Sequence, residues 1–68
     1  MISVAAPIEA DVLRLRHEFL SIPALTLTVA QVARLLGVRT QYAAELLAAL
    51  AQDRLLTRAE TGAYHRAS

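Results

Sequence analysis

The sequence predicts a small, mainly α-helical fold with a β-hairpin near its C-terminal end. Two observations support this prediction. Apolar residues recur at helical spacing in three separate stretches, and the segment around Gly62 then reads as two short strands joined by a turn. A chain of 68 residues has room for one such domain. We expect helices at residues 7–20, 28–36 and 39–52 and a hairpin at residues 55–66, in a single domain over residues 1–68.

Composition limits the possible functions. The chain is 56% apolar and contains no cysteine, so disulfides and thiolate metal sites are excluded. No apolar run reaches the length of a membrane span. The first ten residues lack the basic region of a secretory signal peptide, so we expect a cytoplasmic protein. Seven arginines against six acidic residues give a net charge of only +1, which by itself does not argue for nucleic acid.

The first helix is predicted from its ends and its apolar stripe. Pro7 suits a helix start, where its missing N–H costs nothing. Glu9 and Asp11 place negative charge at the positive end of the helix dipole. Pro23 prevents the helix from continuing far beyond Leu20. The core-facing stripe consists of Ile8, Val12, Leu15 and Phe19, so we interpret this helix as a scaffold.

The next two helices are short and are joined by a tight turn. Thr28 and Gln31 form a capping box at the start of the second helix. Gly37 ends it, because glycine takes the left-handed backbone conformation without steric cost. The third helix begins near Arg39 or Thr40, of which Thr40 is the better N-cap residue. Two helices crossing at such a turn are typical of a helix-turn-helix. Their apolar faces consist of Val29, Val32, Ala33, Leu36, Ala43, Leu46, Leu47 and Leu50.

Short strands are expected on either side of these two helices. Residues 25–27 alternate apolar and polar and read either as a strand or as a loop. Residues 55–57 and 63–66 form the two strands of the hairpin, with the turn at residues 59–62. Arg54 stands in the turn before the hairpin, so either it adopts an uncommon backbone conformation or the turn is reshaped.

The end of the third helix and the hairpin follow a recognisable order: a leucine, polar residues, two apolar residues, a basic strand, a turn and a second strand. The residues that match are Leu50, Leu55, Leu56, Arg58, Gly62, Tyr64 and Arg66. Together with the preceding helix-turn-helix, this segment resembles the winged helix-turn-helix domain of MarR-type and related bacterial transcription regulators, over roughly residues 25 to 66. Those regulators commonly carry glycine where this chain has Asp53 and Arg54, which leaves the direction of the wing open.

The resemblance implies that the third helix enters the major groove of double-stranded DNA and that the wing contacts the backbone. Arginine can bond bidentately to guanine, glutamine to adenine, and threonine to bases or phosphates, whereas glutamate repels phosphates unless it accepts from cytosine. The candidate DNA-binding residues are Arg39, Thr40, Gln41, Tyr42 and Glu45 of the helix and Arg58 and Arg66 of the wing. The alternative is that Arg39 and Gln41 are solvated surface. Tyr64 is expected to pack its ring against the base of the hairpin.

The predicted function is sequence-specific binding of double-stranded DNA in transcriptional regulation, without a cofactor or a metal. No glycine-rich phosphate loop and no recognisable catalytic set is present, so we predict no enzymatic activity. The alternative is a winged-helix module that binds a protein, which the near-neutral charge and the alanine-rich third helix favour.

One such domain reads few base pairs, so a homodimer or a larger assembly is expected. Leu13 and Leu20 lie off the core stripe of the first helix and either mediate self-association or cover neighbouring parts of the same chain.

Overall fold

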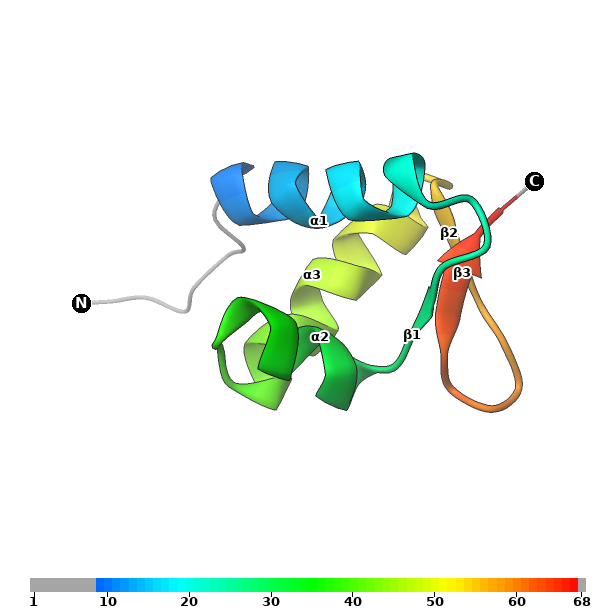
Figure 1. The fold of residues 1–68 in the computed structure, drawn as a ribbon. Coiled ribbons are helices and arrows are strands. Elements are labelled where there is room, and N and C mark those ends of the chain that lie inside the picture. The colour runs from blue at the N-terminus through cyan, green and yellow to red at the C-terminus, as the bar shows by residue number, and fades with distance from the viewer. Residues whose placement is uncertain (1–8, 68) are drawn as a thin grey trace.

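The computed structural model describes residues 9–67, which form three helices and three short strands (Figure 1). In chain order these are α1 (Glu9–Ser21), β1 (Thr26–Leu27), α2 (Val29–Leu36), α3 (Thr40–Gln52), β2 (Leu56–Arg58) and β3 (Tyr64–Arg66). The mainly α-helical fold with a hairpin is therefore confirmed. Pro7 and Ile8, with which we expected the first helix to begin, lie outside the described residues. Among residues 9–67, no helix has the length and apolarity needed to span a bilayer.

The strands form one antiparallel sheet in the order β1-β3-β2. The segment before α2 is a strand and not a loop, because Thr26 pairs with His65 and Leu27 with Tyr64. It adds a third strand to the hairpin, in which Thr57 also pairs with His65. This arrangement of three helices and a wing is the winged helix-turn-helix that the sequence predicts.

The core lies where α3 meets α1, α2 and the sheet. Leu15 and Phe19 contribute two fully buried side chains from the predicted stripe of α1. Each of the four predicted inward residues of α3 is buried. Leu56 at the start of β2 closes the core on the wing side. The remaining buried members of this cluster are Val32, Ala33, Ala43, Leu46, Leu47 and Leu50.

The predicted local signals around α2 are confirmed. The Gln31 amide donates to the Thr28 hydroxyl at 3.2 Å, and the Thr28 amide donates to the Gln31 side-chain oxygen at 2.9 Å. Gly37 has the left-handed φ of 69°, and the Val38 amide reaches back to the Ala33 carbonyl at 2.9 Å. These bonds satisfy backbone groups at both ends of a helix of only eight residues.

The turn between α3 and β2 has the same geometry without a glycine. Arg54 has a φ of 65°, so the first of the two expected outcomes, an uncommon backbone conformation, is the one observed. The Arg54 amide donates to the Ala51 carbonyl at 3.0 Å and the Leu55 amide to the Leu50 carbonyl at 3.1 Å. This pair of bonds is the Schellman motif that usually carries glycine at the left-handed position.

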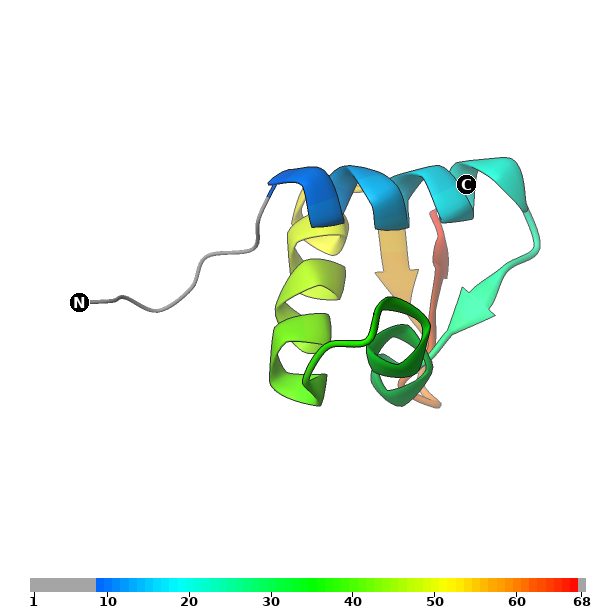
Figure 2. The ribbon, with the colours of Figure 1, turned by 60° about the vertical axis from the view of Figure 1, so that its left-hand side comes forward.

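In space, α1 lies at one end of the folded domain (Figure 1). The turn between α2 and α3 and the turn of the hairpin both lie at the opposite end, as the two views in Figure 1 and Figure 2 agree. The start of α3 and the tip of the wing therefore share one end of the domain.

Candidate nucleic-acid interface

The start of α3 is exposed, and no side chain caps it. Arg39 occupies the N-cap position with an extended backbone, at φ −69° and ψ 150°, and its side chain makes no capping hydrogen bond. Thr40, expected to be the better cap, is instead the first helical residue. The reason is backbone geometry: the first helical bond runs from the Ala43 amide to the Arg39 carbonyl, at 2.9 Å. Both Arg39 and Thr40 are exposed, so their side chains face solvent at the positive end of the helix dipole.

The outward face of α3 carries polar and small residues. Gln41 and Ala48 are exposed, and Glu45 between them is half-buried. Gln52 is exposed as well and continues this face to the last residue of the helix. These residues follow one another at spacings of four, three and four, so they line one side of the helix, opposite the buried Leu50.

Tyr42 does not lie on this outward face. Its side chain is half-buried and packs against the core cluster. Its hydroxyl donates a 2.7 Å hydrogen bond to the Asp11 carboxylate of α1. Tyr42 therefore faces α1 and positions the start of α3, in contrast to the exposed Gln41 one residue earlier.

The two wing arginines lie at opposite ends of the hairpin. In the register of β2 and β3, Arg58 pairs with Tyr64, next to the turn, whereas Arg66 pairs with Leu56, where β2 begins. Arg58 is exposed and Arg66 is half-buried. The structure thus brings Arg58 to the same end as the start of α3 and leaves Arg66 at the other end of the wing. The two wing arginines therefore do not lie together beside the start of α3.

The turn of the wing is held by backbone hydrogen bonds. The Ala59 amide donates to the Ala63 carbonyl at 2.7 Å, and the Gly62 amide donates to the Ala59 carbonyl at 2.9 Å. Gly62 has a positive φ of 93°, a conformation that side chains disfavour. The exposed Glu60 sits in this turn, so the tip of the wing carries an acidic side chain two residues after Arg58.

Two exposed residues were not among the expected site residues: Arg34, at this end of the domain, and Gln52, at the other end of α3. Arg34 lies in the last turn of α2 and is exposed, close in the chain to Arg39. Its place just before the turn between α2 and α3 is the sequence signal that could have identified it. Gln52 was recognisable from its spacing of eleven residues from Gln41, which returns to the same side of a helix.

The charges at this end are mixed. Three exposed arginines, Arg34, Arg39 and Arg58, are offset by two acidic residues, Glu45 and Glu60. No three histidine, cysteine, aspartate or glutamate side chains gather closely enough to hold a metal ion within the part of the chain that the structure describes. The exposed side chains at this end are groups that can form hydrogen bonds and ion pairs.

No protein-family model matches the chain, and the comparisons with curated proteins and with solved structures give no match.

Proposed function

We propose that this chain binds double-stranded DNA in transcriptional regulation, as a cytoplasmic protein without catalytic activity. The observation that carries the proposal is the shared placement of two elements. The first turn of α3 and the turn of the wing lie at one end of the domain, with Arg39, Gln41 and Arg58 exposed there. A helix start flanked by a wing fits a duplex whose major groove receives the helix while the wing follows the phosphates.

Each exposed side chain at the start of α3 has a role in this proposal. Arg39 bonds to guanine and Gln41 to adenine, because their side chains match the acceptor and donor pattern of those bases in the major groove. Thr40 and the uncapped first turn of α3 bond to a phosphate, since the helix dipole and the N–H groups favour an anion there. Glu45, one turn further along the same face, accepts from the amino group of cytosine.

Arg58 contacts the phosphate backbone from the wing, and Arg34 adds a second phosphate contact beside the turn after α2. Tyr42 acts indirectly, because its bond to Asp11 fixes the direction in which α3 leaves the turn. Arg66 has no role in this interface, since it lies at the far end of the hairpin.

A fluorescence-anisotropy titration with a labelled duplex of mixed sequence, at low salt, tests the proposal. We expect binding that weakens with salt, and we expect Arg39→Ala to weaken it by about ten-fold. The matched control is Arg14→Ala, which removes the same charge from an exposed position on α1, at the opposite end of the domain. Equal effects of the two variants, or no binding at high micromolar protein, contradict the proposal.

A second candidate function is a protein-binding module that uses the same end of the domain. Glu45 and Glu60 favour this alternative, because both would approach DNA phosphates with the wrong charge. Leu35 supports it too, since 49% of its surface is exposed on α2. Retention of the fold together with a complete lack of duplex binding would favour this second function.

A further inference from the structure

The outer side of α1 carries exposed apolar side chains. Leu13 is 51% exposed and Leu20 is 43% exposed, and Ile22 just after the helix is 47% exposed. Leu13 and Leu20 are seven residues apart, so they lie along one side of the helix, away from the buried Leu15 and Phe19. Small monomeric proteins rarely leave such a row of apolar groups uncovered without a use for it.

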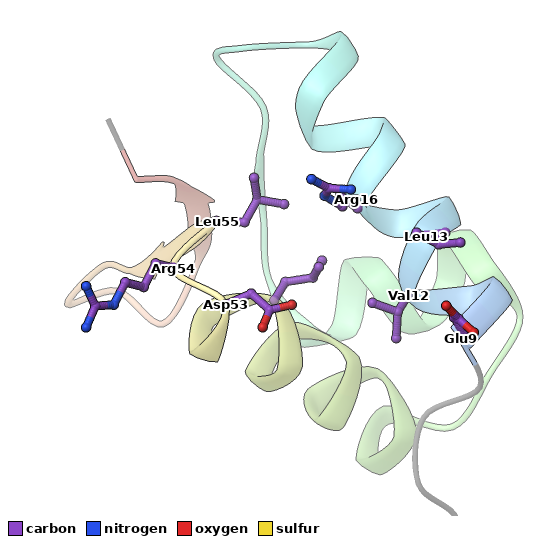
Figure 3. A pocket seen from close by; sticks show the side chains of 8 residues that line it. Glu9, Val12, Leu13, Arg16, Asp53, Arg54 and Leu55 are labelled. Carbon is purple, nitrogen blue, oxygen red and sulfur yellow. The ribbon is translucent and has the colours of Figure 1, made fainter.

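A groove of about 610 Å³ lies directly beside Leu13, between α1 and the turn that follows α3. Figure 3 shows the side chains of α1 on one side of it and those of residues 53–55 on the other, with Arg54 extending away from the rest. The apolar side chains that line this groove are Val12, Leu13, Leu50 and Leu55. An exposed leucine and a hollow whose lining is half apolar and half charged therefore adjoin each other on one face.

Of the four charged residues that line the groove, two belong to the turn after α3 (Asp53 and Arg54), and the other two, Glu9 and Arg16, flank Leu13 along α1. Glu9 precedes it by four residues and Arg16 follows it by three, and all three line the groove. At a rise of 1.5 Å per residue, Glu9 lies about 6 Å along the helix axis on one side of Leu13 and Arg16 about 4.5 Å on the other. Two antiparallel copies of α1 that cross at Leu13 would thus bring each Glu9 to within about 1.5 Å, along the axis, of the level of an Arg16.

We propose that this face pairs with the same face of a second copy of the chain. In this symmetric dimer, Leu13 of each copy enters the groove of the other copy, and Glu9 lies against the partner's Arg16. One two-fold axis generates both ion pairs, because in such an interface the same patch meets itself. The partner is a second copy and not an unrelated protein, because the projection, the hollow and the two opposite charges all belong to one patch and complement each other.

The dimer goes beyond the proposed DNA binding and does not depend on it. Its interface lies on α1, whereas the start of α3 and the turn of the wing lie at the other end of the domain. Pairing through α1 therefore leaves the proposed DNA interface uncovered, so self-association and DNA binding can succeed or fail separately.

Sedimentation of the whole chain over about 10 to 500 micromolar tests the dimer, because a small interface gives a dissociation constant in this range. We expect the average mass of the parent protein, measured by sedimentation, to exceed the monomer mass of 7.4 kDa. Leu13→Gln should weaken association by about ten-fold or more, whereas Leu35→Gln, at an equally exposed leucine of α2, should not. A parent that remains at 7.4 kDa throughout, or a dimer insensitive to Leu13→Gln, overturns the proposal.

A charge swap tests the register. Glu9→Arg and Arg16→Glu each place like charges opposite each other, so each variant alone should associate about ten-fold more weakly than the parent. An equimolar mixture of the two should recover association, because each arginine then meets a glutamate of the other variant. Circular dichroism of each variant verifies the fold. If the mixture associates no better than the separate variants, α1 does not pair in this way.

Discussion

The Tyr42 hydroxyl donates a 2.7 Å hydrogen bond to the Asp11 carboxylate, which links the first turn of α3 to α1 across 31 positions of the sequence. Tyr42 is half-buried, and so is Asp11. The bond joins α1 to the N-terminal end of α3, which carries the candidate interface. Asp11 thus has a second role besides its favourable position near the positive end of the α1 dipole.

Tyr42→Phe should lower the free energy of unfolding by about 1 kcal/mol, because the variant keeps the ring and loses a hydrogen bond to a charged group. Chemical denaturation of the parent and the variant measures this difference. Tyr64→Phe is the matched control, since Tyr64 also packs partly against the core from β3. Equal losses in the two variants would mean that the bond to Asp11 contributes nothing specific.

Arg54→Gly should raise the free energy of unfolding by about 0.5 to 1 kcal/mol. A left-handed backbone costs a non-glycine residue about 1 to 2 kcal/mol, and part of the gain is lost because glycine is more flexible in the unfolded chain. Thermal unfolding checks the prediction as a rise in melting temperature. A fall in melting temperature would show that the arginine side chain stabilises the fold by more than its left-handed backbone conformation destabilises it.

Gly37→Ala should act in the opposite direction and lower the free energy of unfolding by about 1 kcal/mol. A Cβ added at Gly37 meets nothing within 4 Å, so the whole cost arises from the φ of 69° and not from a clash. Gly37→Val should cost more than 1 kcal/mol, because a β-branched residue tolerates this conformation even less. A melting temperature unchanged in both variants would contradict the role of this glycine.

The features that the sequence predicted well are those determined by neighbouring residues. The capping box of Thr28 and Gln31 spans three positions, and the turn at Gly37 needs only one glycine. The apolar face of α3 followed from its spacing, since Ala43, Leu46, Leu47 and Leu50 are buried as expected. Local chemistry was sufficient for these elements.

The placement of the candidate interface residues depended on contacts between distant segments, which spacing does not reveal. The sequence places Tyr42 at the start of the recognition helix, among the candidate DNA-binding residues. In the structure its hydroxyl instead donates a hydrogen bond to Asp11 on α1. Arg58 and Arg66 looked equivalent in the sequence, and only the register of the hairpin places them at its two ends. The first hairpin strand also begins at Leu56, one residue later than expected, because the Leu55 amide is held in the preceding turn by its bond to the Leu50 carbonyl.

Glu45→Gln should strengthen non-specific binding to a duplex of mixed sequence by several-fold, because such a duplex places no cytosine against Glu45 in a fixed register and only the repulsion of phosphates remains. Glu45 lies on the outward face of α3, one turn after Gln41, and its charge opposes the approach of phosphates. Glu18→Gln removes the same charge from α1 and should have little effect. The comparison by fluorescence anisotropy at one salt concentration is sufficient, and equal gains in both variants would indicate an effect of net charge alone.

The salt dependence of duplex binding distinguishes the two wing arginines. Arg34 and Arg58 are the two arginines proposed to contact phosphates at one end of the domain, so the slope of log affinity against log salt should be about −2. Arg58→Ala should reduce this slope by about one and weaken all sequences alike, since phosphate contacts carry no base information. Arg66→Ala should leave the slope unchanged, because Arg66 pairs with Leu56 at the far end of the hairpin and is half-buried there. A slope that falls equally in both variants would mean that the wing meets DNA along its whole length and not through its tip.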